Sequence, residues 1–409
     1  MATTALPRLQ TRRVRRRTGL PLVVQLVSLE LAAGAVAGAV YVDAPRPILA
    51  AIGGAALLLL IVVFGRAKGR WLYQTFGARW RLHRRRVTAK RIRARLSVAT
   101  PGHAGPDSLT ALAPWAPGLA IRAVEDRGRT IGIGQDEAGW FAAVSLAPWV
   151  DVSGARGIRF GLDQLAGVLD ETSVPVSALQ LVSHQTTAPT GRLDTTSAAV
   201  RSYRDLASAA GCPLEQAVWL AVRLTPPDAA EAASSRGGGV AGVDRAIAAT
   251  VGRIEKALAS AGVPYEVLDA DGLREALTLS CGLEEVGRGA LTSTTPVSRE
   301  QWSTWLAGGM AHACFVVRKW PRDPSAQLLA ELGQIPASAV SIAIALRQHG
   351  SHIALLGLVR VVAPPSRLRA AIRQLDSNAG KLGVRLRRLD GEQARGVYAT
   401  APTGGGAAA

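Results

Sequence analysis

The sequence predicts two N-terminal transmembrane helices that form a hairpin, followed by a soluble α/β domain. Leu20 to Val42 gives 23 mostly apolar residues and Ile48 to Gly65 gives 18 without a charge. A hydrocarbon core of about 30 Å requires roughly 20 residues of helix, so both runs can span a bilayer. The five residues between them, 43–47, include two prolines. These prolines disfavour one continuous helix, so the two spans are expected to be antiparallel neighbours.

The cations of this 409-residue chain, whose formal net charge is +18, are concentrated in two blocks. Met1 to Gly19 holds six arginines, Arg66 to Arg95 holds twelve lysines or arginines, and neither block contains an acid. From Leu96 onward the chain has 29 basic and 28 acidic residues. Both blocks flank the apolar runs, so the positive-inside rule places both termini in the cytoplasm, with the chain in the inner (plasma) membrane. Nucleic acid is not an expected partner, because the soluble part is nearly neutral.

A signal peptide is the alternative reading of the N-terminus. Thr11-Arg12-Arg13 precedes the first apolar run, and Ala37-Gly38-Ala39 resembles a small-residue cleavage site. The length of the first apolar run argues against this alternative. Even after cleavage, the second span would leave its basic flank inside.

Several residues of the predicted hairpin suit helix–helix contact. Glu30 lies near the middle of the first span, where an acid costs about 2.5–3.5 kcal/mol, so it is expected to face protein. The sequence leaves open a contact with another subunit, a polar path, or an acid accommodated within the hairpin. Gly34 and Gly38 have GxxxG spacing, and they, like Gly53 and Gly54, would allow close helix approach.

Residues 66–98 predict a basic juxtamembrane helix. Arg70, Trp71, Trp80 and Arg84-Arg85-Arg86 combine cations and aromatic rings directly after a span. Tryptophan favours headgroup depth and arginine favours anionic phosphates, so these residues are predicted to contact membrane lipids. RNA binding is the alternative for arginines interleaved with aromatics.

The remaining chain divides into a linker over 99–118, a cytosolic α/β domain over 119–402 and a disordered tail over 403–409. Turn residues separate short apolar runs, which predict a strand meander packed beside the main body, then a short helix and a further strand. These runs are Ala120 to Asp126, Thr130 to Gln135, Gly139 to Leu146, Asp163 to Glu171 and Ser177 to Gln185.

Two later segments suggest an internal strand-helix-strand duplication. In each, a strand and an amphipathic helix lead to Gly-Val, which opens a strand that ends in Leu-Asp. The first copy has its strand at Val218 to Leu224 and its helix at Val243 to Ala261. The second has strands at Val340 to Arg347 and Ile353 to Val362, and its helix at Ser366 to Leu382. Loops are expected at 236–239 and 282–295.

The motifs of common enzymes are absent: there is no GxxxxGK[ST], GxSxG or HExxH sequence. The three cysteines, Cys212, Cys281 and Cys314, lack metal-ligand spacing and are interpreted as buried apolar groups. Asp269-Ala270-Asp271 could hold a divalent cation on a nucleotide-sugar diphosphate, but Asp271 also suits an N-cap for residues 272–277. No catalytic, cofactor-binding or metal-binding residue is therefore predicted.

Gly69-Arg70-Trp71-Leu72-Tyr73 and Arg84-Arg85-Arg86 resemble the juxtamembrane run of EccE, the membrane component of type VII (ESX) secretion systems. The order of parts is similar over most of the chain, including the strands around 121–139 and the Ala217-Val218-Trp219 strand. The resemblance implies a peripheral subunit of an inner-membrane complex with EccB, EccC and EccD, in which EccC is the ATPase. It implies no catalytic residues.

The sequence thus favours a structural secretion subunit that anchors a cytosolic α/β interaction domain at the membrane. The first alternative is a membrane-anchored, glycosyltransferase-like enzyme that uses Asp269 and Asp271. A membrane-tethered nucleic-acid binder is the second alternative.

Overall fold

A computed structural model of the chain describes most residues between 19 and 406. The chain forms two compact units, one of Val14–Val87 and one that includes Thr88–Ala409. The described residues are 19–67, 70–99, 108–150, 156–157, 164–165, 167, 176–186, 198, 202, 215–283, 298–321, 331–349 and 352–406.

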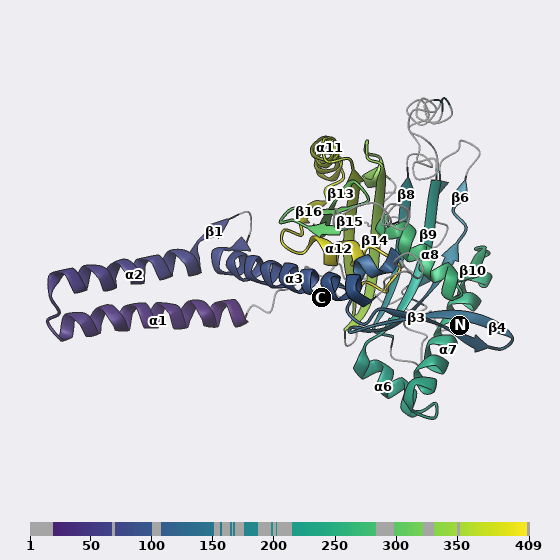
Figure 1. The fold of residues 1–409 in the computed structure, drawn as a ribbon, viewed down its shortest axis with the longest axis horizontal. Helices are drawn as coiled ribbons and strands as arrows, with labels where there is room; N and C mark the ends of the chain where they lie inside the picture. The colour runs from purple at the N-terminus through teal and green to yellow at the C-terminus, as the bar shows by residue number, and fades with distance from the viewer. Residues whose placement is uncertain are drawn as a thin grey trace, which may run out of the picture. The chain divides into compact units, whose positions relative to one another are not determined.

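The N-terminal unit contains two long helices that pack against each other (Figure 1). Helix α1 covers Gly19–Tyr41 and α2 covers Arg46–Phe64, with proline in the first turn of α2. A small ribbon follows, in which β1 (Arg66–Ala67) pairs with β2 (Arg70–Trp71). Helix α3 then runs from Leu72 to Ala99. The juxtamembrane helix expected over 66–98 therefore begins later, because the ribbon reverses the chain first.

Of the described helices, α2 alone is both long and apolar enough to cross a membrane. The apolar segment of α1, Gln25–Tyr41, is shorter than a full span. One predicted span is thus supported by length and composition, and the two-span hairpin remains a prediction.

The second unit is built on one sheet of 12 strands, in which the described pairings are antiparallel. The main path runs in the order β11-β12-β13-β15-β14-β8-β9-β5-β4-β3, while β10 pairs with β5 and β16 pairs with β13. The predicted meander is therefore wrong in its placement, since its strands form one edge of the main sheet. The strands are β3 (Ala120–Asp126), β4 (Arg129–Asp136), β5 (Gly139–Leu146), β8 (Ala178–Thr186), β9 (Glu215–Leu224), β10 (Tyr265–Val267), β11 (Ser298–Glu300), β12 (Trp305–Ala307), β13 (Met310–Lys319), β14 (Ala339–His349), β15 (His352–Ala363) and β16 (Arg385–Arg388), with a separate ribbon of β6 (Trp149–Val150) and β7 (Arg156–Gly157).

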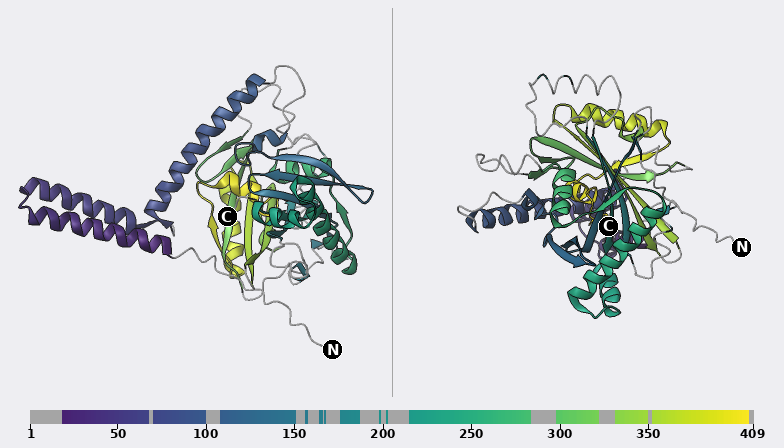
Figure 2. Two further views of the ribbon diagram at one scale, coloured as in Figure 1. Left: turned by 90° about the horizontal axis from the view of Figure 1, so that it is seen from below. Right: turned by 90° about the vertical axis from the view of Figure 1, so that its right-hand side faces the viewer.

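Helices cover both faces of the sheet (Figure 2). One apolar cluster joins one face to α6 (Pro226–Ser234), α7 (Gly239–Ser260) and α11 (Leu368–Lys381). A second cluster joins the other face to the 3-10 turn η1 (Ser108–Leu112), α8 (Ala270–Cys281) and α12 (Gln393–Ala399). The domain therefore has three layers, with the sheet in the middle.

The two halves of the sheet repeat one order of elements. Apart from α6 and the β6–β7 ribbon, the first half runs β3, β4, β5, β8, β9, α7, β10, α8, and the second runs β11, β12, β13, β14, β15, α11, β16, α12. Strand β5 pairs with β4, β9 and β10, as β13 pairs with β12, β15 and β16. The halves meet where β8 pairs with β14, with Val182 opposite Ala343. Two α/β units thus share the sheet.

Two segments expected to be irregular belong to the core. In the predicted linker 99–118, Leu112 is fully buried and Trp115 is 5% exposed, because these apolar groups cover the face of the sheet. In the predicted disordered tail, residues 403–406 are buried. The expected helix at 163–171 and the loop at 282–295 lie largely outside the described residues.

Substitution of Gly139 would test how closely β5 packs against β9. A Cβ there would lie 2.0 Å from the carbonyl oxygen of Leu224, and φ is +126°. Gly128 also has positive φ, at +80°, but has open space around it. We expect Gly128→Ala to cost about 1–2 kcal/mol and Gly139→Ala about 3 kcal/mol or more, because β5 must move away from β9. Urea unfolding of both variants measures the difference, and equal losses would contradict the packing described.

Candidate functional site

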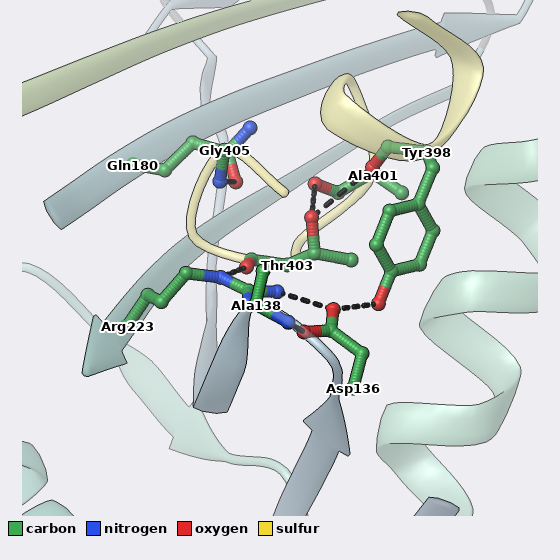
Figure 3. Close-up of polar contacts among 8 residues, drawn as sticks. All are labelled: Asp136, Ala138, Gln180, Arg223, Tyr398, Ala401, Thr403 and Gly405. Carbon is green, nitrogen blue, oxygen red and sulfur yellow. Dashed lines mark hydrogen bonds and ion pairs between the residues drawn. The ribbon is translucent and has the colours of Figure 1, made fainter. Parts of the chain in front are cut away.

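The described part of the sheet domain contains a buried polar cluster of Asp136, Arg223 and Tyr398 (Figure 3). These residues come from the end of β4, from β9 and from α12. Arg223 donates from Nη1 to Oδ1 of Asp136 at 2.8 Å and from Nη2 to Oδ2 at 2.7 Å. The Tyr398 hydroxyl donates to Oδ2 at 2.6 Å. The geometry is a bidentate ion pair, the arrangement in which arginine binds a carboxylate most strongly.

The same cluster holds the C-terminal segment in place. Nε of Arg223 donates to the carbonyl of Thr403 at 2.6 Å. Gln180 donates to the carbonyl of Ala399 at 2.8 Å and accepts from the backbone N–H of Gly405 at 2.7 Å. Gly404, Gly405 and Gly406 all have positive φ, which glycine adopts without strain. The tail is ordered over 403–406 because buried polar groups of β8 and β9 need these backbone partners.

The charge state of the cluster follows from its burial. Desolvation alone would raise the pKa of Asp136, but the hydrogen bonds and charge of Arg223 lower it below 3.8 overall. Burial and the charge of Asp136 raise the pKa of Tyr398 well above 10. At neutral pH, Asp136 is therefore ionised and Tyr398 is a neutral donor. Both side chains of the ion pair are only 4% exposed, so the cluster suits a structural role more than contact with substrate.

A second polar group crosses the centre of the sheet. Cys314, Arg360, Ser341 and His184 lie opposite one another on β13, β15, β14 and β8. Nη2 of Arg360 donates to the Ser341 hydroxyl at 2.5 Å, and Nδ1 of His184 lies 2.8 Å from the same hydroxyl. Arg360 also donates to the carbonyl of Ser280 in α8. The row therefore joins a helix of the first half to strands of the second.

The titratable groups around this row are inert near neutral pH. Burial and the Arg360 charge lower the pKa of His184 to about 3 and that of His312 well below 6.5. Burial raises the pKa of Cys281 above 9 and that of Cys314 to about 12. These two cysteines are free and buried, which confirms their packing role; Cys212 lies outside the described residues. Protonated thiols and neutral, desolvated imidazoles do not supply an activated nucleophile.

The Asp-Ala-Asp sequence caps a helix. Oδ1 of Asp269 accepts from the backbone N–H of Gly272 at 2.8 Å, so Asp269 is the N-cap of α8. The assignment of the cap to Asp271 was wrong, since the helix begins at Ala270. Asp271 is exposed and pairs with Arg274 at 2.7 Å. Within the described part of the chain, no group of three or more His, Cys, Asp or Glu residues could hold a metal ion.

The predicted interface glycines of α1 and α2 have open space beside them. Among the α1 side chains that the structure describes, those of Ala32 and Ala39 are buried. Glu30, Gly34 and Gly38 are exposed at i, i+4 and i+8. A Cβ at Gly34, Gly38, Gly53 or Gly54 would meet nothing within 4 Å. The two helices therefore pack without using these glycines.

Helix α3 has a buried face and an opposite, exposed aromatic face. Ala78 and Leu82 are buried, while Phe76 is 56% and Trp80 is 63% exposed. The guanidinium of Arg84 lies 5.0 Å from the Trp80 ring centroid. Among the other predicted membrane-surface residues, Arg86 is exposed and Trp71 and Arg85 are half-buried; the side chain of Arg70 lies outside the description.

Sequence reasoning missed the buried ion pair. Arg223 and Arg360 each interrupt an otherwise apolar strand, in Ala-Val-Trp-Leu-Ala-Val-Arg-Leu and Leu-Gly-Leu-Val-Arg-Val-Val-Ala. A charge inside such a strand is expected to be paired, so an arginine within an apolar run could have indicated a buried ion pair. It does not reveal the partner, because Asp136 and Tyr398 are far away in the sequence.

Residues 212–317, which include β9, α6, α7, β10 and α8, match the family model described as "Putative type VII ESX secretion system translocon, EccE". The predicted resemblance to EccE is confirmed. The match supports a component of a type VII secretion translocon, and such a component implies other secretion subunits as partners. No curated protein matches the chain.

The ion pair of Asp136 and Arg223 gives a prediction about stability. Asp136→Ala leaves Arg223 buried without its counter-ion, so we expect a loss of about 3–5 kcal/mol in the free energy of unfolding. The double variant Asp136→Leu, Arg223→Met removes both charges and is expected to lose clearly less. Chemical denaturation of the full chain in detergent measures both. A double variant as unstable as the single one would contradict the argument.

The buried histidines predict a pH dependence. The pKa of His184 is lower in the folded state, so the unfolded state binds a proton first as pH falls below about 6.5. Stability present above that pH is then lost progressively toward pH 3, with about 2 kcal/mol lost by pH 5. His184→Asn keeps a polar atom near Ser341 and removes this titration. The difference in urea midpoint between pH 7 and pH 5 should therefore shrink in the variant, and an unchanged difference would exclude His184 as its source.

Proposed function

We propose that this protein is a structural, non-enzymatic subunit of a type VII secretion complex, and that it anchors a cytosolic α/β interaction domain at the inner membrane. The EccE match over residues 212–317 carries the proposal. The neutral imidazoles, the protonated thiols and the capping role of Asp269 agree with it. The transferase alternative loses its support, because one of its two carboxylates is occupied at the start of α8.

In this proposal α1 and α2 both cross the membrane, and both termini are cytoplasmic. The apolar length of α2 and the basic blocks that flank the hairpin support this orientation. The exposed face of α3 then lies at the headgroups, with Phe76 and Trp80 at the interface and Arg84 toward anionic phosphates. Arg86 is also exposed, but it lies one turn after Leu82 and would reach the phosphates from the other side of the helix. Arg70, Trp71 and Arg85 complete the proposed lipid contact.

Glu30, Gly34 and Gly38 form the proposed contact with transmembrane helices of neighbouring subunits. All three lie on the side of α1 that faces away from its buried alanines. In lipid, an exposed carboxyl group is unfavourable, whereas a partner helix could approach the glycines closely and satisfy Glu30. Gly53 and Gly54 offer a second small-residue position on α2. The proposed partners are EccB, EccC and EccD.

The decisive experiment is purification of the tagged full-length protein from native membranes in mild detergent, followed by mass spectrometry of the large fractions. Co-elution with a membrane ATPase and other secretion subunits is expected. A protein that elutes alone, with normal membrane insertion, would refute the structural role.

A pair of variants tests the α1 contact. Gly34→Leu, Gly38→Leu fills the small-residue surface, so we expect the protein to remain in the membrane and to lose most of its co-purifying subunits. Ala33→Leu, Ala35→Leu introduces the same two leucines on other sides of the helix and should retain the co-purifying subunits. Equal loss in both variants would show that bulk in α1, and not this face, disrupts assembly.

A further inference from the structure

The second half of the sheet domain carries a cluster of exposed cations that the first half lacks. They extend from the end of β13 across α11 to the start of β16, and α11 lies beside both strands (Figure 1). No described ion pair involves them. We name this cluster the α11 surface; its residues are Arg318, Lys319, Arg367, Arg369, Arg373, Lys381 and Arg385, all of them exposed.

Several of these cations occupy positions in which they destabilise the folded protein. Lys319 is directly opposite Arg385 in the pairing of β13 with β16, and like charges in that position repel. Arg369 and Arg373 repel at i, i+4 on α11. Arg367 occupies the N-cap of α11 without a capping hydrogen bond, and a cation there opposes the helix dipole. Charged residues that destabilise the local structure, and that make no contact which offsets this, are expected at functional sites.

The first half of the domain shows that the fold does not require these charges. Aligning Gly262-Val263 with Gly383-Val384 places small uncharged residues of α7 at the positions of the α11 cations. The equivalents of Arg367, Arg369, Arg373 and Lys381 are, in that order, Ala246, Ala248, Gly252 and Ser260.

The first half also covers and neutralises its helix. Helix α6 packs on α7 so closely that a Cβ added at Gly242 would lie 2.9 Å from the carbonyl oxygen of Ala233. Asp244 and Glu255 of α7 pair with Arg122 and Arg129 of the sheet. In the second half, residues 364–367 lead directly from β15 into α11, and no counterpart of α6 intervenes. Of the two acids, Glu255 has an equivalent in Asp376, whose pKa is raised by burial and lowered in part by the charge of Arg388, whereas Asp244 is replaced by Pro365. The α11 surface thus lacks the covering helix and one of the two acids, and no ion pair of its seven cations is described.

We propose that the α11 surface binds an acidic segment of a partner protein. Five of its seven cations are arginines, whose planar guanidinium groups suit carboxylates. Across the described residues of 298–406, no large apolar side chain is exposed. The surface therefore lacks the aromatic anchors that α3 presents with Phe76 and Trp80 for a membrane, and the stacking rings that single-stranded nucleic acid uses. The proposal does not depend on which complex the protein joins.

A binding experiment with a defined probe tests the surface. Full-length protein in nanodiscs of zwitterionic lipid is titrated into a fluorescein-labelled, glutamate-rich helical peptide of about 20 residues, and anisotropy is recorded. We expect binding that weakens with added salt. Reversal of three charges in Arg369→Glu, Arg373→Glu, Arg385→Glu should lower the affinity on the order of tenfold or more.

The control reverses three exposed cations of the first half, Arg127→Glu, Arg245→Glu, Lys256→Glu, with the same change in net charge. It should bind the peptide nearly as well as the wild type. Equal weakening in both variants, or no binding by the wild type, would overturn the proposal. So would binding confined to phosphatidylglycerol liposomes or to double-stranded RNA in parallel titrations. Unchanged melting temperatures show that both variants are folded.

Discussion

The sheet domain depends on one buried ion pair, between Arg223 of β9 and Asp136 of β4. Burying a guanidinium is costly unless its donors are satisfied. Both terminal nitrogens of Arg223 donate to the Asp136 carboxylate, and Nε donates to the carbonyl of Thr403. The need to satisfy Arg223 therefore brings the end of the chain onto the first half of the sheet. Tyr398 adds a third donor to Asp136 and fixes the position of α12.

The halves of the domain are joined crosswise by such polar contacts. Helix α12 and the segment after it, which belong to the second half, lie on the first-half strands that carry Gln180 and Arg223. Helix α8, from the first half, accepts a hydrogen bond at Ser280 from Arg360 of the second. Each half therefore has a buried arginine that donates a hydrogen bond to an element of the other half. These contacts give a physical reason for the two halves of the sheet to behave as one domain.

The surface of the protein is divided by chemistry. Large exposed apolar groups are concentrated in α1, α2 and α3, whereas in the described sheet domain only Val240 and Tyr265 are of this kind. Contacts with lipid or with other transmembrane helices are accordingly expected from the N-terminal helices. The sheet domain offers charge instead, with ion pairs around α7 and unpaired cations around α11. A scaffold that holds partners both in the membrane and beside it would need both kinds of surface.

The amino-acid pattern by itself determined the local elements. Short apolar runs bounded by turn residues identified β3, β5, β8, β14 and β15 within a few residues, because such runs are typical of strands whatever lies around them. The repeated Gly-Val and Leu-Asp signals, which mark the ends of α7 and α11 and of the strands that follow, likewise pointed to two similar units. The two blocks of cations and the resemblance to EccE could also be recognised from the sequence alone.

Tertiary structure alone decided which elements meet. The ion pair of Asp136 and Arg223, the burial of Trp115 and the order of residues 403–406 all come from contacts between distant segments, which local composition does not encode. The Thr-Gly-Gly-Gly segment was predicted to be disordered because it has no apolar residue to bury. It is ordered because its backbone N–H and C=O groups form hydrogen bonds with Gln180 and Arg223. Nearly every residue carries these backbone groups, so the pattern of side chains could not predict this role.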